Sequence, residues 1–325
     1  MTRSADPDCT DCPRGCDARG PTSYCGVDKP GRVHWRGVTL LEEHELAPTY
    51  EIYFTGCSLR CRFCTVPDAI ERPREGAWMP PEALVDAIAA PTVPPFRTIA
   101  LVGGDPSVNL PYVRALTPLL RARFPTTPLV FNTNLFFNPA LSAEIARFDW
   151  VVGDLHFWRP GCAARVAGAR GYPAAARAAA EALLAAGGRL ILRLLVLPGH
   201  LDCCAAPAAA WAAGLSGDVR VHVMTHYAPA GRARGHALLG RALTRAEIDR
   251  ARGLLPAAVR RPAEAALDWD HPRLPRHIDP ETPLEIGADG RILFPFVTGA
   301  LLPAAATLEP SLAERLAYLE SPNAG

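Results

Sequence analysis

The chain has 325 residues and a net charge of +1, from 34 lysines and arginines against 33 aspartates and glutamates. Hydrophobic residues make up 49% and charged residues 21%, an ordinary globular composition that accommodates one barrel-sized domain with small appendages. The balanced charge argues against a nucleic-acid partner, and no apolar run reaches the roughly 18 to 20 residues of a membrane helix. Because the chain begins without a charged and then apolar leader, we expect it to be cytoplasmic, with no nucleic-acid or membrane partner.

Seven of the ten cysteines lie in the first 64 residues, at spacings typical of metal sites. The first four follow a Cys-x2-Cys-x3-Cys-x8-Cys pattern within a polar stretch and are Cys9, Cys12, Cys16 and Cys25. A stretch this polar cannot bury a core, so we expect a metal to order it. Thiolate ligands fit either a structural zinc or a second iron–sulfur cluster. Free thiols or a transient disulfide are the alternatives without a metal.

Extended segments between residues 32 and 55 lead into a loop with three further cysteines, Cys57, Cys61 and Cys64. Their Cys-x3-Cys-x2-Cys spacing can place three thiolates at three corners of a cubane [4Fe-4S] cluster. The fourth iron then has no ligand from this loop and is open for chemistry. A structural zinc is the alternative, but zinc normally takes four ligands and this loop offers three.

Beyond this loop the apolar patterns alternate between those of strands and those of helices. We expect strands at residues 97–102, 128–133, 150–155, 190–197 and 219–224, and helices at residues 80–90, 109–124, 139–148, 173–186, 205–213 and 244–254. Thr244 and Glu247 predict a capping box at the last of these helices. Together with the strand before the cysteine loop, the alternation predicts an α/β fold, a partial (β/α)6 TIM-like barrel whose active site lies at the C-terminal strand ends.

The cysteine loop resembles the signature of the radical SAM superfamily, including the aromatic Phe63 just before the last cysteine. In that family the open iron of the [4Fe-4S] cluster binds S-adenosylmethionine (SAM), whose reductive cleavage gives a 5′-deoxyadenosyl radical. The resemblance implies both cofactors and places Phe63 near the adenine. The segment Cys12-Pro13-Arg14-Gly15-Cys16 resembles, more narrowly, an N-terminal element in relatives of the pyruvate formate-lyase activating enzyme.

The same resemblance places polar residues and glycines at the strand ends in the SAM pocket. These residues are Gly103, Gly104, Asp105, Asn132, Asn134, Asp154, His156 and Arg193. Asp105 stands where the family has a glutamate, and His156 stands where the activating enzymes have a lysine. An ordinary turn, an Asx turn and a structural salt bridge are the alternatives for the glycines, the asparagines and the arginine, respectively.

Two adjacent cysteines, Cys203 and Cys204, follow the fifth predicted strand of the barrel. Some radical SAM enzymes use a thiol to return hydrogen to a substrate radical or to bind an additional cluster, so these two residues and His156 are the catalytic candidates. Adjacent side chains usually point apart, so we do not expect this pair to bind one metal together. Cys162 is expected to act as a small hydrophobic residue.

The sequence predicts three parts. They are a cysteine-rich metal-binding extension at residues 1–32, the radical SAM partial barrel at residues 33–258, and a C-terminal extension at residues 259–325 with a hairpin at 283–297 and a short helix at 312–319. The resemblance implies an enzyme that receives electrons from a flavodoxin- or ferredoxin-type donor and acts on a small molecule or a peptide. The alternatives are an activase that installs a glycyl radical on a partner enzyme, and an iron–sulfur or zinc protein without SAM chemistry.

Overall fold

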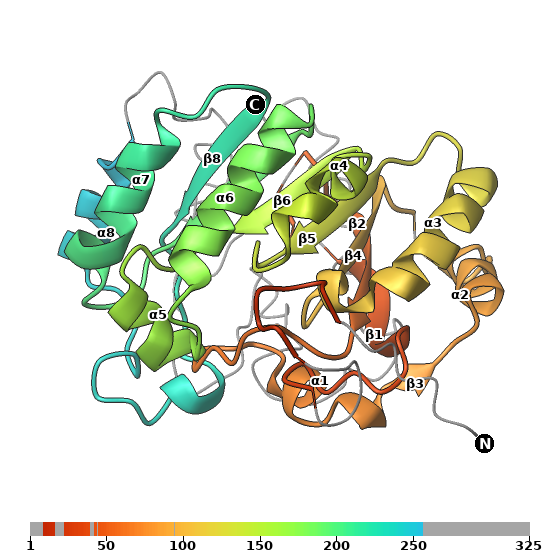
Figure 1. Cartoon of the computed structure of the whole chain (residues 1–325), viewed down its shortest axis with the longest axis horizontal. Helices are drawn as coiled ribbons and strands as arrows, with labels where there is room; N and C mark the ends of the chain where they lie inside the picture. Colours follow the sequence, from red (N-terminus) through yellow and green to blue (C-terminus); the bar gives the residue numbers. More distant parts are fainter. Residues whose placement is uncertain (1–8, 17–22, 40–41, 44, 94, 256–325) are drawn as a thin grey trace.

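The computed structural model describes residues 9–16, 23–39, 42–43, 45–93 and 95–255. Its strands form one sheet in the order β3-β1-β2-β4-β5-β6-β7-β8 (Figure 1). The strands are β1 (Arg32–Thr39), β2 (Thr49–Phe54), β3 (Ala77–Trp78), β4 (Thr98–Gly103), β5 (Leu129–Thr133), β6 (Trp150–Asp154), β7 (Leu190–Leu195) and β8 (Val219–Met224).

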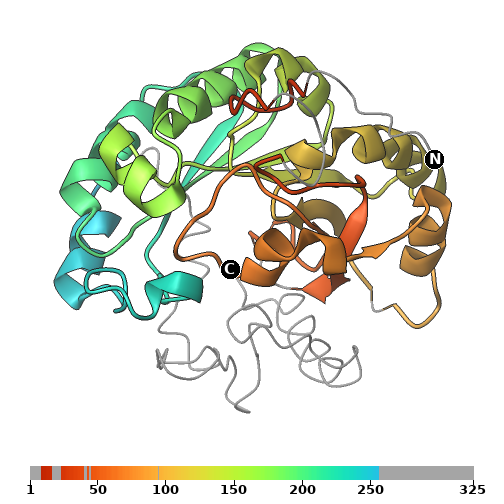
Figure 2. The same cartoon turned by 60° about the horizontal axis from the view of Figure 1, so that its bottom comes forward.

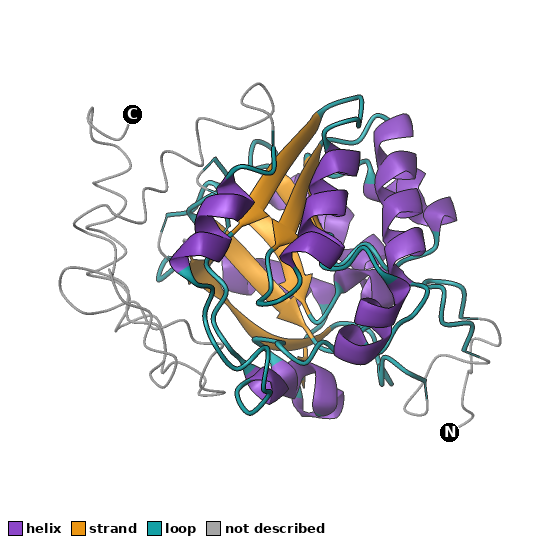
Figure 3. Cartoon of the chain, turned by 90° about the vertical axis from the view of Figure 1, so that its left-hand side faces the viewer, coloured by secondary structure: helices purple, strands orange, loops and turns teal. Residues whose placement is uncertain are grey.

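Helices connect the strands, and most of them lie along the outer side of the curved sheet (Figures 2 and 3). The α-helices are α1 (Pro67–Glu71), α2 (Pro81–Ile88), α3 (Leu110–Arg123), α4 (Ser142–Ile145), α5 (Pro160–Ala167), α6 (Tyr172–Ala185), α7 (Ala206–Ala212) and α8 (Arg245–Arg252). Short 3₁₀ turns lie at η1 (Pro73–Glu75), η2 (Pro106–Asn109), η3 (Pro139–Leu141) and η5 (Gly231–Ala233), and η4 (Leu201–Ala205) is a π-helical turn.

Six strands pair in parallel, in the order β2, β4, β5, β6, β7 and β8. Strand β1 runs antiparallel to both β2 and β3. The sheet is open, because β3 and β8 are its two edges within the described residues. This arrangement confirms the predicted α/β fold with a partial, unclosed TIM-like barrel. All six parallel strands therefore end at the same edge of the sheet, where the predicted site residues lie.

Burial on both faces explains why the central strands form from nearly continuous apolar runs. All residues of β5, and all but the last residue of β4, β6 and β7, are buried. On the outer side, Ala176, Ala179 and Ala180 of α6 are fully buried. These small side chains explain how an alanine-rich helix covers the sheet: they allow a close approach to it.

Most of the elements predicted between residues 32 and 255 are confirmed within one to three residues at each end. The capping box is present, since the Glu247 amide donates to the Thr244 hydroxyl and the Thr244 amide donates to the Glu247 carboxylate. The helix predicted at 139–148 is wrong in extent, because the chain there forms η3 and the single turn α4. Sequence patterns missed α1 and β3, which are too short for a clear period, and also missed the eight-residue helix α5. The predicted hairpin at 283–297 and helix at 312–319 lie outside the described residues.

None of the helices in the described part of the chain combines the length and the apolar character needed to cross a membrane.

Candidate active site

The three cysteines of the loop after β2 lie together at the C-terminal edge of the parallel strands. Gly56 begins the loop with a φ of +84°, and a Cβ there would lie 2.2 Å from a methyl group of Val27. Burial raises the pKa of the thiols of Cys57, Cys61 and Cys64, and the charges of neighbouring cysteines raise those of Cys57 and Cys61 further. Cys57 is buried and Cys61 and Cys64 are half-buried, and three thiols within mutual electrostatic reach form a donor set that fits a bound cationic cluster.

Helix α5 holds the backbone of this cysteine loop. The amide of Arg60 donates to the carbonyl of Ala167 at 3.0 Å, and the amide of Arg62 donates to the carbonyl of Val166 at 2.9 Å. The last carbonyls of a helix have no partner within the helix and need donors from elsewhere. The loop amides therefore satisfy the end of α5, and α5 in turn fixes the conformation of the loop.

The glycines after β4 allow a second close contact with the loop. The amide of Gly104 donates to the carbonyl of Phe54, and the amide of Asp105 donates to that of Gly56, both at 2.9 Å. A Cβ on Gly104 would lie 1.9 Å from the Gly56 oxygen, and one on Gly103, whose φ is +113°, would lie 2.3 Å from the Phe54 backbone. Glycine is thus required for backbone packing at both positions. Contact of Gly103 and Gly104 with SAM stays a prediction.

Asp105 links the ends of β4 and β5 beneath the loop. Its buried carboxylate accepts hydrogen bonds from the amides of Ser107 and Asn134, both at 2.8 Å, and from the hydroxyl of Thr133 at 3.0 Å. Burial raises the pKa of Asp105, and these hydrogen bonds act in the opposite direction. The side-chain amide of Asn134 donates in turn to the Cys57 sulfur at 3.3 Å. The predicted pair of Asp105 and Asn134 therefore positions a cysteine of the loop.

The N-terminal segment packs against the same loop through Arg14, the central residue of the Cys-Pro-Arg-Gly-Cys element. The Arg14 guanidinium donates to the carbonyls of Ser58 and Gly168, both at 2.9 Å, and lies 3.6 Å from the centroid of the Tyr24 ring. Ser58 belongs to the cysteine loop, and Gly168 directly follows α5. A single arginine thus joins three segments that lie far apart in the sequence.

The four N-terminal cysteines lie near one another. Burial raises the pKa of the Cys12 thiol to about 11, and the charges of Cys9, Cys25 and Cys16 add to this effect. Mutual repulsion of this kind is relieved when thiolates share a metal ion. Zinc or a second iron–sulfur cluster at these four residues stays a prediction.

His156 follows β6 and lies beside Phe63 of the cysteine loop, with ring centroids 5.3 Å apart. Burial lowers the pKa of His156 to about 4, so the imidazole is neutral at physiological pH. Its backbone amide donates to the hydroxyl of Tyr172, which donates to the carbonyl of Asp154 at 2.6 Å. The buried Nδ1 of His156 has no hydrogen-bond partner among the residues that the structure describes. Buried polar atoms are normally hydrogen-bonded, so this nitrogen is available to a polar ligand.

A network of buried charges lies further along the sheet, around Arg193 of β7. The Arg193 guanidinium forms an ion pair with both Glu42 and Glu43, with N–O distances of 2.7 Å to Glu43. Asn132 donates to Glu42 at 2.7 Å, and His222 Nδ1 lies 3.2 Å from Glu43. The salt-bridge alternative for Arg193 is therefore present in the structure. Sequence analysis missed the two glutamates, because no periodic pattern or motif distinguishes the segment before β2.

The buried Glu51 and the half-buried Asp154 make this interior rich in carboxyl groups. Burial raises the pKa of Glu51 to about 8, and the charge of Glu42 contributes to the same effect. Burial also raises the pKa of Asp154 to about 6, against the opposing charge of Arg193. At neutral pH the site therefore contains protonated and ionised carboxyl groups side by side, which allows proton storage and recognition of a cationic or hydrogen-bonding ligand.

Replacement of Glu51 by glutamine should make folding stability less dependent on pH. Between the usual pKa of 4.5 and the folded value of about 8, the unfolded chain releases this proton and the folded chain keeps it, so stability falls as pH rises. At pH 8 the free energy of unfolding of Glu51→Gln should therefore exceed that of wild type by on the order of 2 kcal/mol or more, with a higher melting temperature. At pH 5 the gain should be small. Thermal unfolding across this range measures the effect. The exposed Glu75→Gln is the control, and an equal gain at both pH values would contradict the assignment.

Replacement of Gly104 by alanine should displace the cysteine loop. The new Cβ would overlap the Gly56 carbonyl, and overpacking of this kind costs about 1–3 kcal/mol. We expect a lower melting temperature and the loss of most bound iron after anaerobic reconstitution. Gly171→Ala is the control, since nothing lies within 4 Å of a Cβ at that position. Full iron content in Gly104→Ala would show that the close backbone contact is not needed.

Comparison with known proteins finds one family match and several distant relatives. Residues 52–212 match the sequence model of the Radical SAM superfamily. An uncharacterized protein of Methanocaldococcus jannaschii is 26% identical over 217 residues, which cover 65% of this chain and 62% of that protein. A radical SAM methyltransferase from Sphaerobacter thermophilus is 17% identical, with a TM-score of 0.47 and coverage of 64% of each chain.

Streptococcus suis SuiB, solved with precursor peptide SuiA bound, is 13% identical, with a TM-score of 0.46 and coverage of 65% of this chain and 46% of that one. The chain thus spans less than two thirds of the length of each of these relatives. The superfamily match runs from within β2 to the end of α7 and takes in all three cysteines of the loop. The stretch from residue 52 to residue 212 is therefore similar to the radical SAM superfamily.

Proposed function

We propose that this protein is a radical SAM enzyme in which Cys57, Cys61 and Cys64 hold a [4Fe-4S] cluster. The observation that carries the proposal is the set of three thiols, one buried and two half-buried, on a loop fixed from three sides, by α5, by the turn after β4 and by Arg14. When bound, the reduced cluster and SAM supply a 5′-deoxyadenosyl radical that abstracts hydrogen from a substrate.

Aromatic rings and one imidazole form the neighbourhood in which we place the adenosyl group. The Phe63 ring contacts those of His156, Phe157 and Tyr227 at centroid distances of 5.3, 6.2 and 6.3 Å. Phe157 is fully buried, so the rings exclude water from this side of the loop. The unpartnered Nδ1 of the neutral His156 supplies one hydrogen bond to a bound ligand without adding a charge.

Electrons enter, in this proposal, from a flavodoxin- or ferredoxin-type donor at the outer face of the loop. A cavity of about 230 Å³ opens there, and both Cys61 and Cys64 line it. Three arginines, Arg60, Arg62 and Arg232, line this cavity against two acids, Asp68 and Glu71, so the lining has an excess of positive charge for an acidic partner. The two thiols on the wall of this cavity support the proposal that a redox protein docks here.

The substrate we propose is a small molecule or a peptide. Support comes from the buried carboxyl groups of Glu42 and Glu51 and the half-buried one of Asp154, which suit a substrate with amine or hydroxyl groups more than the backbone of a folded partner enzyme. The Cys-Pro-Arg-Gly-Cys element, which resembles part of the activating enzymes, has a role within this chain through the contacts of Arg14 with the loop. No further observation favours the activase alternative.

Anaerobic incubation with SAM and dithionite tests the proposal. Reconstituted wild-type protein should release 5′-deoxyadenosine and methionine, and Cys61→Ala should release less by at least about 100-fold because the cluster loses a ligand. Thr65→Ala, which changes an exposed residue on the same loop, should retain wild-type activity. Absence of 5′-deoxyadenosine from wild-type protein that contains about four irons per chain would support the alternative of an iron–sulfur protein without SAM chemistry.

A further inference from the structure

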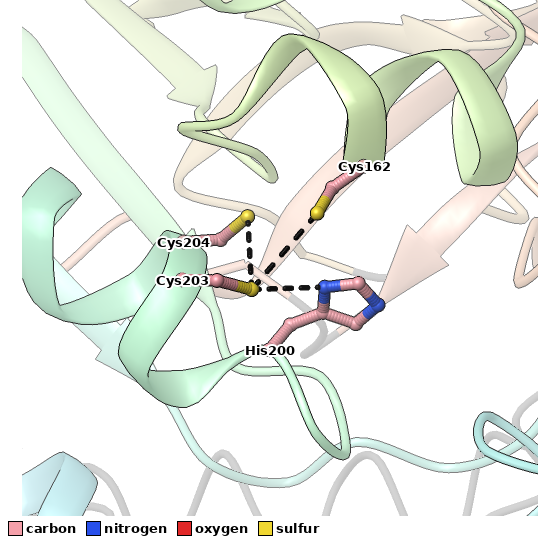
Figure 4. A group of neighbouring side chains, drawn as sticks. All are labelled: Cys162, His200, Cys203 and Cys204. Carbon is pink, nitrogen blue, oxygen red and sulfur yellow. Dashed lines mark hydrogen bonds between the residues drawn. The ribbon is translucent and has the colours of Figure 1, made fainter.

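Four potential metal ligands converge at a second place on the same edge of the sheet (Figure 4). The sulfur of Cys203 lies 3.9 Å from that of Cys162, 3.7 Å from that of Cys204 and 3.4 Å from Nδ1 of His200. All four ligand atoms lie within 4.8 Å of one another, and no other group of three or more in the described residues meets this limit. Three of the four residues are buried.

The three distances at Cys203 match three of the six edges of a zinc tetrahedron. Zn–S bonds of about 2.3 Å and Zn–N bonds of about 2.0–2.1 Å place two sulfurs about 3.8 Å apart and a sulfur and a nitrogen about 3.5 Å apart. The three distances at Cys203 lie within about 0.2 Å of these values. A disulfide needs an S–S separation of about 2.05 Å, and an iron–sulfur cubane binds each thiolate to a different iron and so spreads them further apart.

We propose that Cys162, His200, Cys203 and Cys204 bind one zinc ion in a closed tetrahedral site. Three thiolates and one imidazole form a recognised structural zinc set, with no coordination position left open.

The π-helical turn η4 explains how adjacent cysteines face one ion. The amides of Cys204 and Ala205 both donate to the carbonyl of His200, at 3.0 and 3.1 Å. This bifurcated acceptor widens the turn and gathers His200, Cys203 and Cys204 on one side. The expectation that the two adjacent cysteines point apart is therefore wrong, since their sulfurs are 3.7 Å from each other.

The surroundings also fit a thiolate-rich zinc site. The backbone amides of Arg159 and Trp158 donate to the sulfur of Cys204. Arg165 Nη2 lies 3.7 Å from the sulfur of Cys162. Zinc with three thiolates and a neutral imidazole has a net charge of −1, which the arginine and the amide donors compensate.

Such a zinc site would fix helix α5, which in turn fixes the loop of Cys57, Cys61 and Cys64. Cys162 lies in the first turn of α5, and the carbonyls at the other end of α5 accept hydrogen bonds from the loop amides. With eight residues, α5 is too short to be stable alone. A zinc ion would therefore fix α5 to the turn after β7 and, through α5, fix the loop. Zinc-bound thiolates have no hydrogen to donate, so this proposal and the predicted hydrogen-donor role of Cys203 and Cys204 exclude each other.

Zinc and iron counts on the full-length protein test the proposal, independently of SAM cleavage. Cys203→Ser should contain about one zinc fewer per chain than wild type, whatever its iron content. The matched control is Cys61→Ser, which should lose iron and keep this zinc. An unchanged zinc count in Cys203→Ser, or a disulfide that joins Cys162 to either other cysteine in anaerobically purified protein, would overturn the proposal.

Cobalt substitution provides a second measurement if Cys203→Ser folds poorly. In full-length protein with Cys57, Cys61, Cys64, Cys12 and Cys16 replaced by alanine, Co²⁺ should bind with one equivalent and give tetrahedral d–d bands with thiolate charge transfer. Adding His200→Ala should shift the d–d bands and weaken binding about tenfold or more, because water replaces the imidazole. Adding Cys25→Ser instead should change neither the d–d bands nor the affinity for Co²⁺. Absence of thiolate charge transfer in wild-type protein loaded with Co²⁺ would contradict the site directly.

Discussion

The hydrogen bonds from the amides of Arg60 and Arg62 to the last carbonyls of α5 are the contacts on which the site depends. A loop that presents three cysteines to one cluster cannot form regular structure, so its backbone groups need partners elsewhere. The end of a helix has the opposite shortage, since its last carbonyls need donors. The two segments satisfy each other, and Arg14 and the turn after β4 fix the loop from the other sides. We therefore expect the loop conformation to be set by these contacts before iron binds.

Charge compensation is the second constraint on this interior. Arg193 lies on a central strand, where an unpaired guanidinium would cost several kcal/mol, and Glu42 and Glu43 supply the opposite charge. Two carboxylates around one arginine leave an excess of negative charge. Burial raises the pKa of two further acids, Glu51 and Asp154. The interior of the open barrel therefore favours protonated acids and cationic or hydrogen-bonding ligands.

The fold was largely predictable from the sequence because the parallel strands are buried on both faces and appear as apolar runs between helical patterns. The residues at the strand ends were found by their motifs, but the structure gives several of them a supporting role. Asp105 links two strand ends, and Gly104 permits a backbone contact. The proposed zinc site of Cys162, His200, Cys203 and Cys204 was not predicted, since it depends on a π-helical turn and on α5. Neither element has a clear sequence signal.

Hydrogen–deuterium exchange at the amides of Arg60 and Arg62 in iron-free protein tests the central claim most directly. If the loop is fixed by α5, by Arg14 and by the turn after β4, both amides should exchange slowly without iron, at rates close to those of the amides within α5. Exchange at the rate of an unstructured peptide would show that the metal, and not the surrounding protein, sets the conformation of the loop.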